Sequence, residues 1–502
     1  MAVRNGAEYL AGLRDGRAIW LRGKRIADVT SEPGLERTAQ TIAAYYDFQS
    51  RPALRELMTY ETEDGERAPT SFIQPRSKDD LRRRADAFAA WAEVSCGLMG
   101  RSPDYMNAAV AAVGMARDFL GRNDPELGEH AQNVYLHCRR GDLCLTHTFI
   151  TPMVDRFKPL KDQEPYINAG VVRRMEDGIV VRGAKSVATL APFADENMLL
   201  SLGGLNRIEP ESVEYAICFN IPLDTPGLSF VGRDVLDDGS SHFDHPLAGR
   251  FEEMDCLAVF DDVLVPWERV YAYRDVDLAN DMARGLRFIE SLGHQVVCKN
   301  VAKTRFLLGL AHLLAESTQV SSFINVQEKL GDITTYLMTM ESLALAAVEG
   351  AYQAENGYWY CNPAAINAAL RLYPDFYVQI IDHLKQLGGS GYVAMPAEAT
   401  LDALGAAVEN YFRGATLDAH GKVQLFRLAW DIAGSGWGGR QELYERFFFG
   451  DRTRMRAALY LGYDKGEAIR MVRRILEPPR PGAPLPLPER FAPESVGVSG
   501  EA

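Results

Sequence analysis

Six residues that end at Tyr105, with the sequence Gly-Arg-Ser-Pro-Asp-Tyr, combine a cation, a phenol and a helix start. Ser102 is a typical N-cap, Pro103 suits the first helical position, and Asp104 falls in the first turn. Free backbone N–H groups and the helix dipole favour an anion at such a start. Arg101 adds a charge-assisted hydrogen bond to a phenolate or carboxylate. The residues alone leave open that Arg101 pairs with a surface acid and Tyr105 simply packs.

Two isolated histidines are further candidates for chemistry. His147 lies in a Thr-His-Thr segment and His294 in a Gly-His-Gln segment. An imidazole can donate, accept or transfer a proton near neutral pH, although a single histidine is more often a satisfied core or surface residue. The segment 242–245 has no second ligand pair at zinc-like spacing, so we predict a loop there and no metal site. Residues 388–391 predict a helix-ending turn rather than a dinucleotide fingerprint.

Helical patterns dominate residues 1–145. Ser77 and Asp80 form a predicted capping box, followed by apolar residues on one helical face at Leu81, Ala85, Phe88, Trp91 and Ala92. The run Arg82–Arg84 is expected on the solvated face of that helix. A second helix is predicted over Pro103–Leu120.

Residues 146–275 change to short β-prone runs separated by turns. The Asp-Gly pairs at 177–178 and 238–239 are typical turns. We expect a β-barrel or sandwich whose strands include 178–182, 215–220, 228–231 and 257–260.

Helical periodicity returns beyond residue 280, and a Pro-rich tail follows from Pro478. The sequence predicts an α+β protein with a helical domain over 1–145, a β-barrel domain over 146–278, a helical bundle over 279–477 and a tail over 478–502. The long helical segments are expected near 282–318, 325–354, 363–387, 400–413, 421–434 and 439–475.

Composition excludes several classes of protein. The chain has 502 residues, of which 47% are hydrophobic and 24% charged, as in a globular protein. A net charge of −14 argues against nucleic acid or an anionic membrane as a partner. No apolar run reaches the roughly 18 residues of a membrane span, and no signal-peptide core is visible, so we expect a cytoplasmic protein. Seven cysteines without a Cys-x-x-Cys pair predict reduced thiols.

Eight blocks of sequence, in order over about residues 5–470, resemble one known family. They are 5–10, 13–17, 28–30, 99–105, 146–148, 183–189, 265–269 and 438–446. The family is that of the large component of 4-hydroxyphenylacetate 3-monooxygenase. The resemblance implies an acyl-CoA-dehydrogenase-like fold that assembles as a homotetramer or a dimer.

The resemblance also implies a two-component flavin monooxygenase. A separate NAD(P)H:flavin reductase would supply reduced FAD, which reacts with O2 to a C4a-hydroperoxyflavin and hydroxylates a para-substituted phenol ortho to its hydroxyl. The substrate would be 4-hydroxyphenylacetate or a tyrosine-like compound. This chemistry requires a pocket that excludes water and a shell that stabilises a phenolate.

The same resemblance assigns residues of this chain to the site. Arg101, Tyr105 and His147 hold the phenol, with His294 as a second candidate base. Substrate contacts are expected at Arg101, Ser102, Pro103, Asp104, Tyr105, His147, Ser201 and Leu202. Flavin contacts are expected at His147, Thr148, Phe149, Met153, Val154, Asp155, Arg156, Thr189, Gly450, Asp451, Arg452 and Thr453. An apolar Leu202, where the family pattern suggests a hydroxyl, argues against 4-hydroxyphenylacetate itself.

Other functions stay open on the sequence. A halophenol or nitrophenol monooxygenase of the same family would share these residues. The related 4-hydroxybutyryl-CoA dehydratase needs cluster-ligating cysteines where this chain has Arg101 and Tyr105. An acyl-CoA-dehydrogenase-like enzyme needs a glutamate base, which no pattern marks, and a non-catalytic flavin-binding protein would not need Arg101, Tyr105 and His147.

Overall fold

A computed structural model of the chain describes residues 3–152, 154–155, 157–202, 207–237 and 239–476. The residues fall into two compact units, Met1–Arg452 and Thr453–Ala502. The predicted contacts Met153 and Arg156, Asp238 of one turn, and the Pro-rich tail lie outside the described residues. No helix in the described part of the chain is long and apolar enough to cross a membrane.

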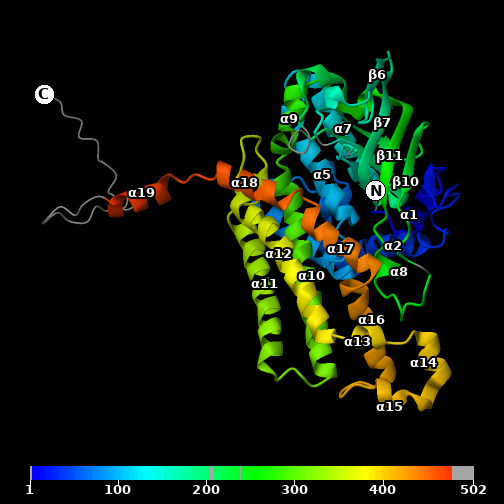
Figure 1. Cartoon of the computed structure of the whole chain (residues 1–502). Coiled ribbons are helices and arrows are strands. Elements are labelled where there is room, and N and C mark those ends of the chain that lie inside the picture. The colour runs from blue at the N-terminus through cyan, green and yellow to red at the C-terminus, as the bar shows by residue number, and fades with distance from the viewer. Residues whose placement is uncertain (1–2, 153, 156, 203–206, 238, 477–502) are drawn as a thin grey trace, which may run out of the picture. The chain divides into compact units, whose positions relative to one another are not determined.

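Seven helices form the N-terminal part of the first unit (Figure 1). The capping box at Ser77 is confirmed, because its side chain accepts the N–H of Asp80 and the Asp80 carboxylate accepts the N–H of Ser77. A short hairpin of β3 (Thr59–Glu61) and β4 (Arg67–Pro69) precedes this helix. The helices are α1 (Gly6–Gly12), α2 (Glu36–Ser50), α3 (Arg55–Met58), α4 (Lys78–Val94), α5 (Pro103–Met115), α6 (Arg117–Leu120) and α7 (Pro125–Gly141).

Two details of this region differ from the prediction. The helix predicted to run to Leu120 ends at Met115, since Ala116 leaves helical geometry at φ −92° and ψ 17° before α6 begins. The arginine run is not wholly solvated either. Arg84 is only 1% exposed and hydrogen-bonds to His294, because α10 (Phe288–Ser317) covers that face of α4. Periodicity within one helix does not show which polar positions a distant helix will cover.

The β-region forms two sheets. The six-stranded sheet has the order β2-β1-β10-β11-β7-β6, and the four-stranded sheet has the order β12-β9-β8-β5. All four predicted strand segments overlap observed strands, namely β7, β9, β10 and β11. The strands of the two sheets are β1 (Ile19–Leu21), β2 (Lys24–Arg25), β5 (Leu145–Thr148), β6 (Gly170–Arg174), β7 (Gly178–Thr189), β8 (Glu196–Leu200), β9 (Ile217–Pro222), β10 (Leu228–Gly232), β11 (Asp255–Pro266) and β12 (Val270–Tyr273).

The N-terminal region contributes strands β1 and β2 to the six-stranded sheet. Ile19 of β1 pairs in parallel with Phe230 of β10, so a segment expected in the helical region completes the large sheet. The small sheet is built on β8, which pairs in parallel with β5 and antiparallel with β9. The Thr-His-Thr segment lies in β5, where His147 pairs with Met198 of β8. All four residues of β5 are buried.

Long helices follow the sheets, and α10 (Phe288–Ser317), α11 (Ile324–Glu349) and α12 (Pro363–Gly388) lie side by side (Figure 1). Three predicted segments are interrupted. The segment near 282–318 breaks at Arg287, whose φ is +48°, and the segment at 400–413 breaks at Gly405, with φ +50°. The segment 439–475 divides into three helices, the first break containing Gly450 at φ +113°.

The remaining elements of this region are shorter. A small hairpin of β13 (Tyr352–Gln353) and β14 (Trp359–Tyr360) connects α11 to α12. The other helices are α8 (Ala248–Phe251), α9 (Val276–Gly285), α13 (Gly391–Ala394), α14 (Glu398–Leu404), α15 (Glu409–Phe412), α16 (Ala419–Ala433), α17 (Gly436–Phe447), α18 (Arg452–Gly462) and α19 (Gly466–Leu476). Within the first unit, α5, β5, α10 and α17 contribute side chains to one buried polar region around Arg101.

Candidate active site

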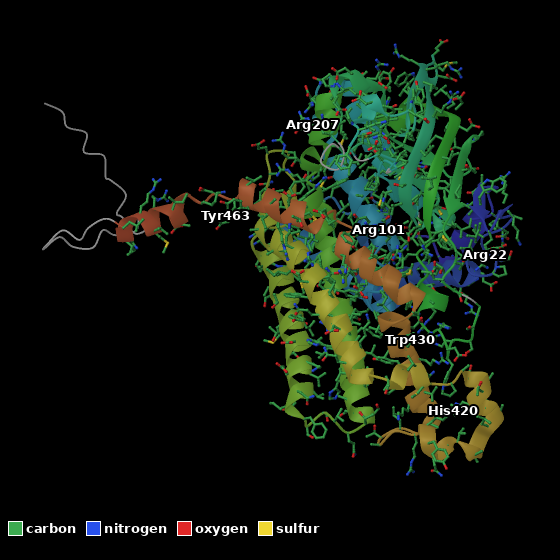
Figure 2. The ribbon with its side chains drawn as sticks, in the orientation of Figure 1. Arg22, Arg101, Arg207, His420, Trp430 and Tyr463 are labelled. Carbon is green, nitrogen blue, oxygen red and sulfur yellow. The ribbon has the colours of Figure 1, made fainter. Side chains whose placement is uncertain are left out.

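Arg101 is the centre of the buried polar region, and Figure 2 shows it in the interior of the first unit. The side chain is 6% exposed, so the alternative of a surface ion pair is wrong. Its Nε donates to His147 Nε2 at 3.0 Å, and its Nη1 donates to the Tyr444 hydroxyl at 3.0 Å. The Nη2 group has no hydrogen-bond partner among the described residues. Three of the five N–H donors therefore remain for a ligand oxygen, and two of them are on Nη2.

Aromatic rings enclose the guanidinium. Its carbon lies 4.0 Å from the ring centroid of Tyr105 and 5.2 Å from that of Phe448. His147 stacks on Phe149 with centroids 4.5 Å apart and an angle of 20° between the rings. The structure thus brings Arg101, Tyr105 and His147 together, as the sequence predicts, in a setting where cation–π contacts add to the hydrogen bonds.

His147 is held as a neutral imidazole. Burial, and then the charge of Arg101, lowers its pKa well below the usual value. Since Arg101 donates to Nε2, the ring proton must lie on Nδ1. Nδ1 is buried and has no partner among the described residues. An orphaned buried donor of this kind suits a ligand oxygen.

The helix start itself is satisfied from within the protein. Glu253 Oε1 accepts the N–H of Arg101 at 2.6 Å, and the Ser102 hydroxyl donates to Asp104 at 2.6 Å instead of capping the helix. The Asp104 carboxylate also accepts from Gln295 of α10. These internal partners compete with an external anion at the helix start, which stays a prediction, and the donors free for a ligand are side-chain groups.

A chain of partly buried ion pairs, joined to the backbone N–H of Arg101 through Glu253, extends to the β-region. Glu253 Oε2 binds Arg440 of α17 at 2.6 Å, and Arg440 binds both oxygens of Asp255. Asp255 also accepts the Thr189 hydroxyl at 2.8 Å. Although burial alone would raise it, Arg440 and Arg233 hold the pKa of Asp255 well below its usual range. The network thus spans from the predicted phenol contact Arg101 to the predicted flavin contact Thr189.

A second buried cluster, Lys299, Lys303 and Glu445, lies behind Tyr444. Both ammonium groups bind the same oxygen of Glu445, and none of the three side chains is more than 1% exposed. Burial, opposed by the attraction of Glu445, lowers the pKa of Lys299 to about 7. Pattern analysis missed this cluster, because Lys299 and Lys303 resemble a solvated i, i+4 pair. Glu445 and Tyr444 do lie in the family-like block 438–446.

His294 is separated from this arrangement. Its Nδ1 lies 3.4 Å from Nε of Arg84, and its ring meets Phe88 edge-on. Burial, and then Arg84, lowers its pKa well below the usual value. His294 makes no hydrogen bond to Arg101, Tyr105 or His147 in the described structure.

The other residues expected to contact substrate or flavin differ in how exposed they are. Thr148 and Ser201 are buried, and the Ser201 hydroxyl is already used by the carbonyl of Tyr215 at 2.6 Å. Leu202 is an apolar neighbour of Ser201 and is 9% exposed. Val154 is 66% exposed, on an open loop. Of the predicted C-terminal flavin contacts, Gly450, Asp451 and Arg452 end the first unit and Thr453 begins the second.

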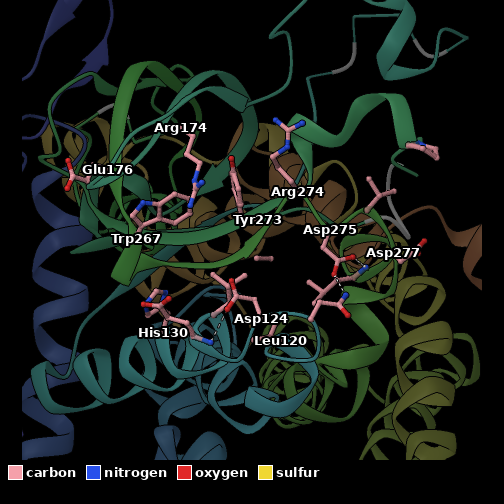
Figure 3. Close-up of a pocket in the computed structure, with 17 residues that line it drawn as sticks. Leu120, Asp124, His130, Arg174, Glu176, Trp267, Tyr273, Arg274, Asp275 and Asp277 are labelled. Atoms are coloured by element: carbon pink, nitrogen blue, oxygen red, sulfur yellow. Dashed lines mark hydrogen bonds and ion pairs between the residues drawn. The ribbon is translucent and has the colours of Figure 1, made fainter.

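The remaining features of the sequence, namely the histidine-containing loop and the cysteines, lie outside the region around Arg101. His245 bonds Asp431, in a loop as expected, and the seven cysteines are free thiols. The described residues hold no group of His, Cys, Asp or Glu suited to a metal ion. A surface cavity of about 810 Å³ contains none of the predicted site residues (Figure 3). Trp267 and Tyr273 line it together with charges of both signs, such as Arg174 and Asp277.

The buried Asp104 yields a prediction for stability. Burial raises its pKa to about 7, although Ser102 and Gln295 oppose the shift. An unfolded chain loses this proton near pH 4, so the folded state alone keeps it up to about pH 7 and stability falls with rising pH in that window. Asp104→Asn removes this penalty, because a flipped Gln295 amide can pair with the new amide through its free Oε1.

The expected gain of Asp104→Asn over the parent chain is about 1.4 kcal/mol for each pH unit between pH 4 and 7. Denaturant unfolding at fixed protein concentration from pH 5 to pH 8 measures it. Asp86→Asn, at an exposed position of α4, is the matched control and should show no such trend. A stability difference that does not change with pH would contradict the account of Asp104.

Comparison with known proteins places this site in a family. Residues 5–272 match the family described as 4-hydroxyphenylacetate 3-hydroxylase N terminal, and residues 279–477 match its C-terminal counterpart. The 4-hydroxyphenylacetate 3-monooxygenase oxygenase component of Thermus thermophilus is 43% identical, over 95% of this chain and 98% of that protein. The 4-nitrophenol 2-monooxygenase oxygenase component of a Rhodococcus species is 33% identical, over 91% of this chain and 88% of its own.

Solved structures agree with the sequence comparison. A 4-hydroxyphenylacetate 3-monooxygenase oxygenase component in complex with FAD and 4-hydroxyphenylacetate superposes with a TM-score of 0.90, at 43% identity over 94% of this chain and 98% of that chain. A 4-hydroxybutyryl-CoA dehydratase from N. maritimus shares the fold, with a TM-score of 0.84 at 18% identity over 95% of this chain and 97% of its own. The chain belongs to the family of 4-hydroxyphenylacetate 3-monooxygenase oxygenase components.

Proposed function

We propose that this chain is the oxygenase component of a two-component monooxygenase, which uses reduced FAD and O2 to hydroxylate a para-substituted phenol ortho to its hydroxyl. The observation that supports the proposal is that Arg101, Tyr105 and His147 are buried in contact with one another. Nη2 of Arg101 and Nδ1 of His147 have no partner among the described residues and can donate to a ligand. A family member has been crystallised with FAD and 4-hydroxyphenylacetate. Both observations fit a phenol held next to a flavin.

Arg101 stabilises the ionised phenol. Burial alone would lower its pKa, yet Tyr105, Tyr444 and Glu253 raise it, so the guanidinium stays charged. A fixed cation in a dry pocket favours the phenolate over the neutral phenol. The phenolate is the more nucleophilic form at the ortho carbon, which is the position to be hydroxylated.

His147 supplies a neutral donor. With its pKa held low by burial, the Nδ1–H donates to the phenol oxygen without adding a second positive charge next to Arg101. Tyr105 is buried, and burial raises its pKa, so its ring packs against Arg101 as a neutral phenol. The ring of Phe149 stacks on His147, and the ring of Tyr105 lies against Arg101, so the donors are flanked by apolar surface.

The site also fits a flavin. The rings of Phe149 and Phe288, which lie next to His147, form an apolar wall against which an isoalloxazine ring could pack beside the phenol site. The further contacts that we propose are Thr148, Thr189, Val154 and Asp155, with residues 450–452 of the same unit. Reduced FAD, delivered by a separate NAD(P)H:flavin reductase, would supply two electrons, so that one atom of O2 enters the ring and the other leaves as water.

The para substituent would meet Ser201 and Leu202. The Ser201 hydroxyl already donates to Tyr215, and Leu202 offers no hydrogen bond. A nitro- or halophenol is a second candidate substrate class, because this end of the site is less polar than a carboxylate requires. The similarity to a 4-nitrophenol 2-monooxygenase oxygenase component supports this second substrate class.

We also propose a cytoplasmic homotetramer or dimer with a helical, a β-barrel and a helical domain over 1–145, 146–278 and 279–477. Exposed apolar side chains on α11, including Met338 and Leu345, support an assembly through the long helices. A bridge between Ile150 and Ser186 joins the segment after β5 to β7, which supports barrel-like closure of the sheets. Seven free thiols are typical of a reducing compartment.

Replacing Arg101 tests the phenolate site. Arg101→Lys keeps a charge but loses the planar fork that serves His147, Tyr444 and a ligand together. We expect kcat/KM for phenol hydroxylation to fall about 100-fold, or ~2.7 kcal/mol, with more of the O2 consumed released as H2O2. Arg22→Lys, at an exposed arginine that pairs with Asp234, is the control. Unchanged coupling of O2 use to product in Arg101→Lys would refute the assignment.

Replacing Leu202 tests the para end of the site. Leu202→Ser introduces a hydrogen-bond donor, so KM for 4-hydroxyphenylacetate should fall about tenfold relative to KM for the neutral 4-methylphenol. Leu202→Met preserves the apolar character and should leave the ratio of the two KM values as it is. Steady-state kinetics with both phenols measures the ratio. An identical ratio in Leu202→Ser and in the parent chain would place the para substituent elsewhere.

A further inference from the structure

Tyr444 contacts Arg101 from a distant part of the chain. Its hydroxyl accepts from Arg101 Nη1 at 3.0 Å in a buried hydrogen bond that links residues 343 positions apart. The guanidinium carbon lies 5.3 Å from the centroid of the same ring. The hydrogen bond occupies Nη1, while the bond to His147 occupies Nε. Only the N–H groups directed elsewhere stay free for a ligand.

Gly100 leaves the space that the Tyr444 ring occupies. A Cβ added at Gly100 would lie 2.2 Å from both Cζ and the hydroxyl oxygen of Tyr444, closer than any side chain allows. The residue before Arg101 must therefore be glycine for the ring to pack against the backbone. This contact gives Gly100 a physical role that the sequence motif alone does not explain.

The helix that carries Tyr444 is fixed on both sides. Glu445, the next residue, binds Lys299 of α10 at 2.7 Å. Arg440, one turn earlier, binds Glu253, which accepts the backbone N–H of Arg101. The ring of Tyr444 also stacks on Phe448 with centroids 4.8 Å apart. Helix α17 thus holds the backbone of residue 101 through Arg440 and its side chain through Tyr444.

We propose that Tyr444 is a positioning residue, which fixes the rotation of the Arg101 guanidinium so that Nη2 is presented to the phenol oxygen. This inference rests on the proposed function and extends it to a residue on α17. Without the hydroxyl, Nη1 loses its buried acceptor and the guanidinium is free to turn toward another partner. The bound phenol then loses part of the stabilisation of its anionic form.

Charged and titratable groups surround the pair on every side. They are Tyr105 on α5, His147 on β5, Glu253 before β11, Lys299 and Lys303 on α10, and Arg440 and Glu445 on α17. Removing the Tyr444 hydroxyl changes none of their charges. A shift in the ionisation of a bound phenol in such a variant therefore reports the placement of Arg101.

The experiment uses the full chain with oxidised FAD and 4-nitrophenol, whose phenolate absorbs visible light and which is not turned over without a reductant. Titration of the bound chromophore with pH gives its pKa. We expect Tyr444→Phe to raise that pKa by about one unit, a tenfold loss of ionisation, with the FAD dissociation constant unchanged. A role in packing alone would lower the unfolding midpoint and leave the pKa of the bound phenol in place.

Tyr377→Phe is the matched control, because that hydroxyl is buried beside Lys303 and has no partner among the described residues. In a double-mutant cycle, Tyr444→Phe should have no further effect once Arg101→Met is present. If Tyr444→Phe does not fold, Gly100→Ala, which displaces the ring and keeps its hydroxyl, should give the same pKa shift.

The outcomes separate the two proposals. A folded Tyr444→Phe with the parent pKa for bound 4-nitrophenol overturns the positioning role, while the phenol site stands if Arg101→Met still loses the phenolate signal. Failure of the parent chain to bind or ionise the phenol overturns the proposed function itself.

Discussion

The structure around the site depends on one constraint. The guanidinium of Arg101 is buried, and none of its hydrogen bonds to the described residues goes to a carboxylate. Arg101 donates to a neutral imidazole and a neutral phenol, and it lies over aromatic rings. A charge removed from water is tolerated only where hydrogen bonds and surrounding dipoles replace hydration. Because the partners of the side chain are neutral, the positive charge is not cancelled locally and is left to act on an anionic ligand.

The surrounding ion pairs keep this arrangement in place. Glu253 binds the backbone of residue 101 rather than its guanidinium, and Arg440 then ties Glu253 to Asp255 in the β-region. Buried networks of this kind contribute little net stability when complete, yet losing one partner leaves a charge unpaired at a cost of several kcal/mol. They define a geometry, and that geometry links the strand carrying Thr189 to the helix start carrying Arg101.

Much of this could be predicted from the sequence, because local patterns reflect local physics. The cap at Ser77, the strands from Gly178 and Leu228, and the long helices follow from periodicity and turn residues. Long-range coverage could not be predicted. The burial of Arg84, the closing of the large sheet by Ile19, and the approach of Tyr444 to Gly100 each depend on a segment far away in the sequence. The grouping of Arg101, Tyr105 and His147 was suggested by family resemblance rather than by spacing.

Control over the reaction of reduced flavin with oxygen, and its direction to a bound phenol, are what the proposed oxygenase must achieve. The most direct measurement is a rapid-mixing absorbance trace of the purified chain with reduced FAD and oxygenated buffer, with and without a para-substituted phenol. We expect flavin reoxidation far slower than in protein-free solution, and a faster final phase with formation of the catechol when the phenol is present. Reoxidation as fast as that of free flavin, unaffected by any phenol, would contradict it.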